Sequence, residues 1–498
     1  MNIHTCQTIR RAEQALFDSG VISSDELMEI AISESLETLA RDPFFRHCED
    51  RFTCVVVYAG KGKNAGDAIG LAWALGFRKI TLRSVCRVHE MAQETQQRLN
   101  ELPDDCLYIE DEPLVPQDGK AFFGTEGVLI IDGLLGSGAS GALRPKYAEM
   151  VQEMNALRTA HPRSVILAVD VPTGLGADDG AVHGSAVEAD ATIAIGCVKP
   201  GLVADGAEDY VGRLICVPLP DDLHLPPSND KVLDESALQL LPRRPYSCYK
   251  NRAGRVRIVA GSVGYTGAAE MCAEAALASG AGLVELYCLP SVYPILAVRL
   301  SPEVMVHPIH SYADVPREGA DAMLIGPGLG KPDAAELPAL QALVEQPTCP
   351  LVLDADGLNL TAEHGWSISP RAILTPHPGE MRRLYPAAAQ LSRAACATRF
   401  VQQHPCTLLL KGARSIITDG SALLYNSTGG PYMATGGQGD VLSGVIAAFV
   451  AQGLSPVDAA ALGAYSCGLA ATLTHTADGE PLAVRASSIL SFIARLNY

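Results

Sequence analysis

Aromatic residues, closely spaced cysteine or histidine pairs and long apolar runs are scarce or missing in this sequence. Phenylalanine, tryptophan and tyrosine make up only 5% of its 498 residues, whereas glycine contributes 46. That mixture favours α/β layers with close helix-to-sheet packing over a β-sandwich. The 14 cysteines include no C-x-x-C pair, and the histidines form no cluster at metal-ligand spacing. We therefore expect reduced cysteines in the core and no zinc or redox motif.

The sequence also lacks an apolar segment that is long enough to cross a bilayer. It has no excess of positive charge. Residues 1–13 have early charges but no apolar core of a secretory signal after them. The chain has 38 Lys and Arg against 56 Asp and Glu, which gives a formal net charge of −18. Neither nucleic acids nor anionic membranes attract such an acidic protein. We expect a cytoplasmic protein that binds neither, with any anionic ligand held in a local positive pocket.

The length of the chain predicts more than one domain. A chain of 498 residues, 48% hydrophobic and 19% charged, is globular but too long for a single core. Residues 218–231 are rich in proline, polar and without periodicity, as is typical of a linker. We therefore predict one domain over residues 1–222 and a second over residues 231–498.

In the N-terminal half, apolar strand patterns end in glycine turns or acids. Residues 6–41 have a helical pattern, and the β-branched run 52–58 leads into a glycine-rich turn and a helix over 59–75. Two further strand patterns end at Asp132 and Asp170. Because the carboxyl ends of parallel strands line the ligand crevice of an α/β sheet, these turns and acids predict one site.

The C-terminal half repeats this arrangement and predicts a second α/β domain. Strand patterns begin at residue 255 and recur over 283–289, 322–325, 350–353 and 407–410, with helical patterns between most of them. Polar or glycine-rich turns follow the strands, at residues 326–330, 354–359, 375–380 and 411–415. Lys411 and Arg414 would supply the positive charge that a nucleotide phosphate needs. The alternative for each is a solvated surface pair, and for Arg414 the two interpretations are close to even.

The most informative stretch spans residues 426–449. Its glycines at 436, 437 and 439 precede an alanine-rich apolar run, which indicates a tight turn feeding the start of a buried helix. Free N–H groups and the helix dipole at that start would bind a phosphate. Asp440 lies in the same turn and could accept a proton from a hydroxyl beside the phosphate, so the stretch indicates phosphoryl transfer. The alternative is that Asp440 only caps the helix.

The chain as a whole resembles the bacterial bifunctional NAD(P)H-hydrate repair enzymes, which join an NAD(P)HX epimerase to an ADP-dependent NAD(P)HX dehydratase. The resemblance covers nearly all residues, and six segments carry it in the dehydratase half: residues 261–268, 326–330, 353–359, 375–380, 410–412 and 435–444. It implies an α/β fold, with a three-layer Rossmann-like N-terminal domain and a ribokinase-like C-terminal domain.

For the dehydratase half, the resemblance implies repair of damaged cofactors, NADHX and NADPHX, which carry an added water as a ring hydroxyl. Asp440 would deprotonate that hydroxyl, ADP would donate its terminal phosphoryl group, and loss of the phosphate ester would restore NAD(P)H. By resemblance, the nucleotide would contact Lys411, Gly412, Ala413, Arg414, Ser415, Gly437 and Gly439. The hydrate would contact Ala268, Gly328, His377 and Asp440, with Glu380 helping to hold Mg²⁺. For His377, a plain turn role is the alternative.

For the epimerase half, the resemblance implies that Asp170 is the acid-base group and that K⁺ is held by Asn64, Asp132 and Thr173. The hydrate would bind Asp170 and two loops, formed by Lys63, Asn64, Ala65, Gly66 and Asp67, and by Gly136, Ser137, Gly138, Ala139, Ser140, Gly141 and Ala142. Three positions depart from the family pattern. Lys63 brings an ammonium beside the cation site, and Ala65 and Ala68 add methyl groups where glycine lets a phosphate approach closely.

Two other functions are compatible with the motifs. A ribokinase-like small-metabolite kinase would phosphorylate a hydroxyl and stop there. Alternatively, the N-terminal domain is a non-catalytic binding module attached to a working dehydratase. For the partners we expect the small molecules NADHX, NADPHX and ADP, and a homo-oligomer as the assembly.

Overall fold

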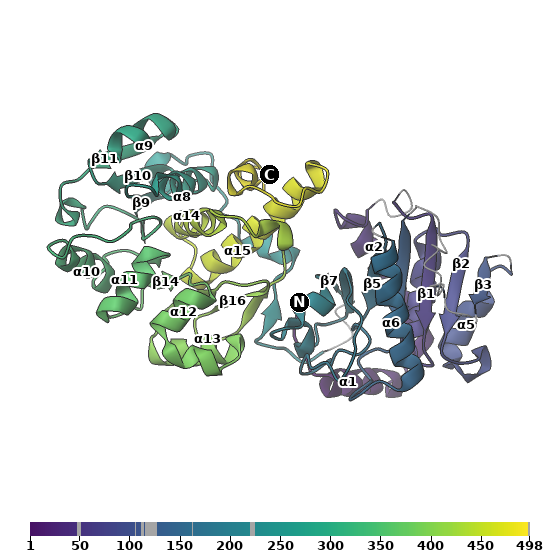
Figure 1. Ribbon diagram of the computed structural model, residues 1–498. Helices are drawn as coiled ribbons and strands as arrows, with labels where there is room; N and C mark the ends of the chain where they lie inside the picture. The colour runs from purple at the N-terminus through teal and green to yellow at the C-terminus, as the bar shows by residue number, and fades with distance from the viewer. Residues whose placement is uncertain are drawn as a thin grey trace. The chain divides into compact units, whose positions relative to one another are not determined.

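The computed structural model describes residues 1–46, 51–104, 106–110, 114, 127–161, 163–219 and 225–496. The chain divides into two compact units, Met1–Lys231 and Val232–Tyr498, each drawn in Figure 1. The domain bounds expected from the sequence, 1–222 and 231–498, remain a prediction. Part of the predicted linker, residues 220–224, lies outside the described residues.

The first unit is built on a seven-stranded sheet in the order β3-β2-β1-β4-β5-β6-β7. All of its pairs are parallel, and the order is that of a doubly wound dinucleotide-binding fold. Its elements are α1 (Cys6–Asp18), α2 (Ser24–Arg41), β1 (Cys54–Ala59), α4 (Asn64–Ala74), β2 (Ile80–Ser84), α5 (Gln93–Glu101), β3 (Leu107–Glu110), β4 (Val128–Gly133), α6 (Pro145–Ala160), β5 (Val165–Val169), β6 (Ala191–Ile195), α7 (Glu208–Val211) and β7 (Arg213–Val217).

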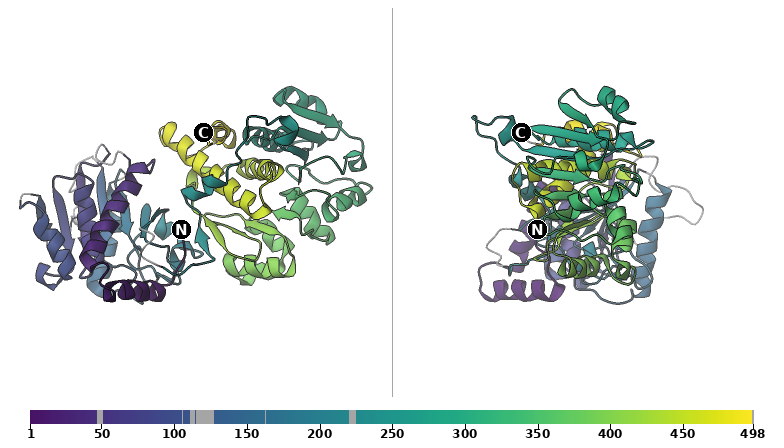
Figure 2. Two further views of the ribbon diagram at one scale, coloured as in Figure 1. Left: turned by 180° about the vertical axis from the view of Figure 1, so that it is seen from behind. Right: turned by 90° about the vertical axis from the view of Figure 1, so that its left-hand side faces the viewer.

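Alternate residues of β1 supply two separate cores, one on each face of this sheet. Val55 and Val57 pack with residues of α2, α4 and α5, whereas Val56 and Tyr58 pack with residues of α6. A strand buried on both faces has a continuous apolar sequence, as residues 54–59 do. The unit therefore has three layers, with helices on both sides of the sheet (Figure 2).

The second unit is built on a ten-stranded sheet in the order β11-β10-β9-β12-β13-β14-β15-β16-β17-β8. Strands β9 to β15 pair in parallel, and β16 and β17 continue the sheet antiparallel. Its elements are β8 (Lys231–Val232), β9 (Arg255–Val259), α8 (Thr266–Ala278), β10 (Leu283–Cys288), α9 (Tyr293–Arg299), β11 (Val304–Pro308), β12 (Ala322–Ile325), α10 (Leu337–Glu345), β13 (Leu351–Leu353), α11 (Asp356–His364), β14 (Ala372–Leu374), α12 (Pro378–Leu384), α13 (Arg393–Gln403), β15 (Thr407–Leu410), β16 (Ser415–Thr418), β17 (Leu424–Asn426), α14 (Gln438–Ala451), α15 (Pro456–Ala477) and α16 (Leu490–Ile493).

The small-residue helices α8, α14 and α15 form one large core with the sheet, and they lie together in Figure 1. Alanine and glycine let α8 and α14 approach closely. A Cβ atom added at Gly444 of α14 would lie 2.2 Å from the Cys272 carbonyl oxygen of α8, so the contact leaves no room for a side chain at residue 444.

We expect Gly444→Ala to destabilise the second unit by about 1–3 kcal/mol, because the added methyl group must push backbone away from backbone. The chemical denaturation midpoint of the full chain would measure this loss. Gly267→Ala is the matched control, since a Cβ atom there meets nothing within 4 Å. It should be neutral or stabilising by up to about 1 kcal/mol. Equal midpoints for the two variants would contradict the packing argument.

The described cysteines are free thiols, as predicted, and most are buried. Cys54, Cys86, Cys216 and Cys248 are only half-buried, so the expectation of core positions is wrong for these four. Within the described ranges, no helix combines the length and the apolar character needed to cross a membrane.

Candidate active sites

In the second unit, the predicted turns gather at the carboxyl edge of the sheet. Strands β9, β12, β13, β14 and β15 are neighbours and run in parallel, so the turns that follow them meet there. The strand order reverses between β9 and β12, which is where α/β sheets place their ligands. A Cβ atom added at Gly328, after β12, would lie 3.0 Å from Cβ of Ala268. The two predicted hydrate contacts are therefore neighbours at this reversal.

The glycine turn before α14 forms the helix start that the sequence predicts. Gly437 is the N-cap with φ +93°, a conformation that favours glycine, and a Cβ atom there would lie 2.3 Å from the Met271 sulfur. Asp440 lies in the first turn of α14. Gly437 occupies the N-cap position, so Asp440 is not the N-cap residue, and its role as a base stays a prediction.

Asp440 has the electrostatic environment of a general base. Burial and the charge of Asp354 together raise the pKa of its carboxyl group to about 6, against the opposing effect of Lys411. A carboxylate with a raised pKa is a better proton acceptor and is still ionised at neutral pH.

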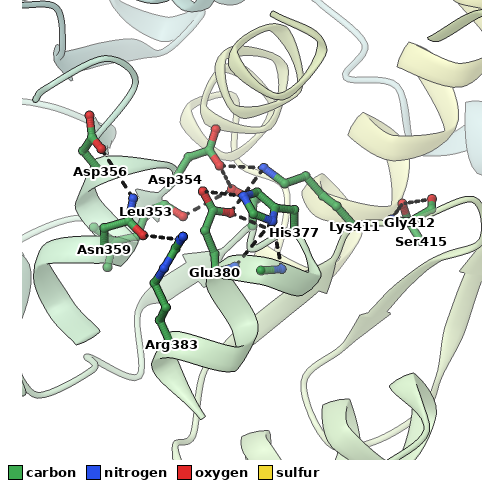
Figure 3. Close-up of polar contacts among 12 residues, drawn as sticks. Leu353, Asp354, Asp356, Asn359, His377, Glu380, Arg383, Lys411, Gly412 and Ser415 are labelled. Carbon is green, nitrogen blue, oxygen red and sulfur yellow. Dashed lines mark hydrogen bonds and ion pairs between the residues drawn. The ribbon is translucent and has the colours of Figure 1, made fainter. Parts of the chain in front are cut away.

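An ion pair between a buried carboxylate and a half-buried lysine lies beside Asp440 and joins the ends of two strands (Figure 3). The Lys411 ammonium, after β15, is 2.9 Å from Oδ1 of Asp354, after β13. The same oxygen accepts a 2.9 Å hydrogen bond from the Thr375 hydroxyl group. Burial acts to lower the pKa of Lys411, but Asp354 and Glu380 outweigh it and leave that pKa above its ordinary value. Lysine 411 therefore keeps its positive charge inside the site.

His377 and Glu380 form a capping box at the start of α12. The His377 Nδ1 atom accepts from the Gly379 amide at 2.9 Å, and the Glu380 carboxylate accepts from the His377 amide at 2.8 Å. Burial, followed by the charge of Lys411, lowers the pKa of His377. A neutral imidazole whose Nδ1 atom accepts carries its proton on Nε2, so that nitrogen remains a donor. The turn role that the sequence left open is thus real.

The predicted nucleotide segment, residues 411–415, forms the turn between β15 and β16. The Gly412 amide donates to the Ser415 hydroxyl group at 3.3 Å, and Ala413 is exposed. Arg414 is only 5% exposed, so the alternative of a solvated surface pair is wrong for this residue. Its carbonyl oxygen accepts from the Arg393 guanidinium, which also lies where a Cβ atom of Gly412 would be.

In the first unit, the strand order reverses between β1 and β4, and the predicted epimerase residues follow β1, β4 and β5. Asp170, after β5, has φ +70°, a strained conformation for a residue other than glycine. Its Oδ2 atom accepts from the Ser137 amide at 3.0 Å, and its Oδ1 atom pairs with the buried Lys199 ammonium. Lys199 also donates to the carbonyl oxygens of Ile195 and Cys197 at 3.2 Å.

The predicted cation ligands lie together next to Asp170. Asp132 is fully buried and accepts from the Thr173 amide at 2.7 Å and the Thr173 hydroxyl at 2.8 Å. Burial raises the pKa of Asp132 to about 6. The Asn64 amide group donates to the carbonyl oxygens of Leu135 and Val169, both at 3.1 Å.

The three departures from the family pattern each have protein neighbours of their own. The Lys63 ammonium pairs with Glu94 at 3.1 Å and also binds the Ser24 hydroxyl, so its charge is already neutralised by a neighbour. Ala65 and Ala68 are fully buried in the core beneath the turn. Their methyl groups pack inward, and their effect on a bound phosphate stays a prediction.

The remaining predicted contacts of this unit fall into two groups. Gly66 is buried and Asp67 half-buried at the start of α4. Burial, followed by the charge of Asp170, raises the pKa of Asp67 to about 8, so this carboxyl group is protonated at neutral pH. In the loop after β4, Gly136 and Ser137 lie against Asp170. The rest of the loop, residues 138–142, is exposed.

Comparison with known proteins gives both units a family. A family model described as NAD(P)H-hydrate dehydratase matches residues 256–495, and one described as YjeF-related protein N-terminus matches residues 24–201. The bifunctional NAD(P)H-hydrate repair enzyme of Coxiella burnetii is 36% identical over 492 residues, which cover 95% of this chain and 94% of that protein. The chain belongs to the bifunctional NAD(P)H-hydrate repair enzyme family.

A repair enzyme from Escherichia coli agrees with that assignment. The Escherichia coli enzyme is 36% identical over 487 residues, covering 93% of this chain and 88% of its own. The crystal structure of the ADP/ATP-dependent NAD(P)H-hydrate dehydratase from Bacillus subtilis, co-crystallised with ATP/Mg²⁺, is 28% identical, with a TM-score of 0.47. It covers 53% of this chain and 95% of that one. The predicted fold class, function and enzyme class are confirmed at the level of this family.

In this NAD(P)H-hydrate repair enzyme, the structure adds residues that had no predicted role. Asp354 lay in a predicted turn without a function, and Thr375 hydrogen-bonds to it. Lys199 follows β6, a strand that the sequence analysis did not identify. Arg393 begins α13 and contacts the nucleotide segment. The position of an acid at a strand end could have identified Asp354 as a site residue. No pattern in the sequence identifies Lys199 or Arg393 in this way.

Proposed function

We propose that this chain repairs NAD(P)H hydrates with both of its units. The first unit would interconvert R- and S-NAD(P)HX, and the second would dehydrate S-NAD(P)HX with ADP, giving NAD(P)H, AMP and phosphate. Family membership supports both reactions. The observation that carries the proposal is the Asp440 carboxylate in the first turn of α14, next to the Lys411–Asp354 pair and the glycines of an anion-binding helix start.

In the dehydratase reaction, Asp440 would accept the proton of the ring hydroxyl as its oxygen attacks the terminal phosphorus of ADP. The bond between that phosphorus and the bridging oxygen breaks, and AMP leaves. The bond between the ring carbon and the ester oxygen then breaks, so phosphate leaves with the former hydroxyl oxygen. The neighbouring ring carbon releases a proton, and the ring double bond forms. The N–H groups at Gly437 and Gly439 would stabilise charge on the transferring group.

The acidic groups of the second unit could bind a Mg²⁺ ion that enters the site bound to the nucleotide. No group of three or more His, Cys, Asp or Glu residues in the described chain has the geometry to hold a metal ion. Mg²⁺ at phosphoryl-transfer sites usually takes one or two carboxylates together with substrate phosphates and water. Glu380 would be such a ligand, although its carboxylate also caps α12. The ion would supply neutralisation of phosphate charge.

In the epimerase reaction, Asp170 would move the proton that opens and recloses the hydrated ring carbon. Its Oδ2 atom is held by the Ser137 amide at 3.0 Å, which fixes the carboxylate beside the loop of residues 136–142. The protonated Asp67 carboxyl group would supply a hydrogen-bond donor in the same region.

The residues around Asp132 fit a K⁺ ion. Asp132 is buried with Thr173 and Leu134 as its hydrogen-bond partners, and a buried carboxylate with neutral partners favours a nearby cation. Turning the Asn64 amide group by half a rotation would place its oxygen beside the Leu135 and Val169 carbonyl oxygens. A hard cation binds such oxygens. K⁺ would supply a fixed positive charge at Asn64, Asp132 and Thr173.

The direct test is to give the full-length protein a mixture of both NADHX epimers with ADP, Mg²⁺ and K⁺. Return of the dihydronicotinamide absorbance for the whole pool is the expected result. If the absorbance stops rising once the S epimer is consumed, the first unit has no epimerase activity. A stable phosphorylated product without NADH would favour the small-metabolite kinase.

A homo-oligomer and a cytoplasmic location also remain predictions. Light scattering would test the oligomeric state.

We expect dehydration to slow as the pH falls through about 6. Asp440 must be ionised to accept the proton, and its pKa is raised to about 6. The turnover number is therefore full above that pH and lost below it, with a tenfold loss per pH unit in the acid limb. Turnover at saturating ADP and S-NADHX, measured between about pH 5 and 8, would test this. Recovery after return to neutral pH controls for unfolding, and a flat profile would contradict the assignment.

A further inference from the structure

Lys411 is the first residue of the predicted nucleotide segment, but its side chain leaves that segment. The backbone amide of Lys411 donates to the Pro376 carbonyl oxygen at 2.9 Å, which ties β15 to the turn after β14. From there the ammonium reaches Asp354 at 2.9 Å and lies 4.0 Å from Glu380. Figure 3 shows it directed toward these carboxylates and away from Gly412 and Ser415.

The same ammonium lies against the helix start that would hold the transferring phosphoryl group. A Cβ atom added at Gly439 would be 3.2 Å from the Lys411 Nζ atom and 3.8 Å from Oδ2 of Asp354. The charge of Asp440 also acts on Lys411. Three features therefore converge at one point: the first turn of α14, the proposed base and one half-buried positive charge.

We propose that the Lys411 ammonium contacts the phosphoryl group in transfer, and that Asp354 and Thr375 position it for this contact. This inference rests on the proposed dehydratase function and revises the expectation that Lys411 holds the AMP portion. The balance of the reaction is unchanged: the bond from phosphorus to the bridging oxygen breaks, the bond to the substrate oxygen forms, and Asp440 takes the proton. Lys411 gives up no proton and acts through its charge.

The physical reason for this role is the position of the Lys411 charge beside the transferring group. Negative charge on the transferring group is spread over its outer oxygens, and a preorganised cation there lowers the barrier without reorganising. Asp354 is 1% exposed and held by the Thr375 hydroxyl group, so it fixes the direction of the flexible lysine side chain. The amides and hydroxyl of residues 412–415 remain for the AMP portion.

AMP and ADP separate the two roles, because AMP lacks the group that is transferred. In Lys411→Met, calorimetry should find AMP binding within about twofold of the wild type, while ADP binding weakens about tenfold. The turnover number of dehydration should fall about 10²–10³-fold. Lys250→Met, at an exposed lysine outside the site, is the control and should behave as the wild type. The double variant Lys411→Met/Asp354→Asn removes both charges together and guards against misfolding around a single buried charge.

The acid limb of the turnover profile gives a readout that a structural role would not move. Lys411 lowers the pKa of Asp440 and Asp354 raises it. Lys411→Met should therefore shift the acid limb to higher pH, whereas Asp354→Asn should shift it to lower pH. Loss of AMP binding with an unchanged turnover number at saturating ADP would overturn the inference. Absence of ADP-dependent dehydration in the wild type would instead reject the proposed function, and the AMP and ADP affinities would still test Lys411.

Discussion

Asp440→Asn is expected to lower the turnover number of S-NADHX dehydration by about 10²–10⁴-fold, with ADP binding retained. Asparagine has nearly the shape of aspartate but cannot accept the proton of the substrate hydroxyl. The glycines at 437 and 439 and the start of α14 remain in place, so the nucleotide still has its anion-binding site. Single-turnover kinetics with saturating ADP, together with calorimetric ADP titration, would measure both quantities.

The matched control for this variant is Asp333→Asn, at an exposed aspartate outside the site, which should leave turnover and stability unchanged. Asp440→Glu keeps the charge but moves the carboxylate along the first turn of α14, so an intermediate loss is expected. If Asp440→Asn turned over like the wild type, the proton would have another acceptor, and Asp354 and Glu380 would be the next residues to replace.

Local patterns predicted the core of the dehydratase site. Three glycines before an alanine-rich run predicted the turn, the helix α14 and the position of Asp440, because each depends on a few adjacent residues. The polar turns after β12, β13, β14 and β15 were predicted as well, and they meet because parallel strands bring their carboxyl ends to one edge. The antiparallel strands β16 and β17 and the outer strand β11 were not predicted, because their short runs have little periodicity.

Side-chain directions and long-range pairs could not be predicted from the sequence. Lys411 and Asp354 are 57 residues apart, and only the strand order makes them neighbours. Lys63 lies beside the proposed cation ligand Asn64, yet its side chain turns to Glu94 of α5. Neighbouring positions on the first turn of a helix point in different directions, so sequence adjacency to a site residue does not decide whether a side chain faces the ligand.

Backbone strain marks both sites and was invisible in the sequence. Asp170 has φ +70° and Ala355, next to Asp354, has φ +48°. Each conformation costs of the order of 1–3 kcal/mol for a residue with a side chain, and it persists only where the surroundings enforce it. Glu480 has a positive φ outside both sites, but the two positions at the sites lie at strand ends whose carboxylates pair with a lysine, the buried Lys199 in one unit and the half-buried Lys411 in the other. The two sites therefore share a design although their sheets differ.

Asp170→Asn should abolish the enzymatic conversion of R-NADHX, lowering it by about 10²–10⁴-fold, while dehydration of the S epimer continues. Lys199→Met should impair the same step for a different reason. It leaves the Asp170 carboxylate without its buried partner, which costs about 3–5 kcal/mol of stability in such pairs. Recovery of NADH from pure R-NADHX would measure the epimerase, and recovery from pure S-NADHX would measure the dehydratase in the same protein.

The pair of variants separates chemistry from packing in the first unit. Asp170→Asn/Lys199→Met removes both charges, so it should regain much of the stability that Lys199→Met alone loses, yet remain inactive as an epimerase. Asp209→Asn and Lys79→Met, at exposed positions, are the controls and should epimerise normally. Equal rates of R-NADHX recovery in the wild type and in Asp170→Asn would contradict the role of Asp170. In that case the first unit would be a binding module, because spontaneous epimerisation would then supply the S epimer in both proteins.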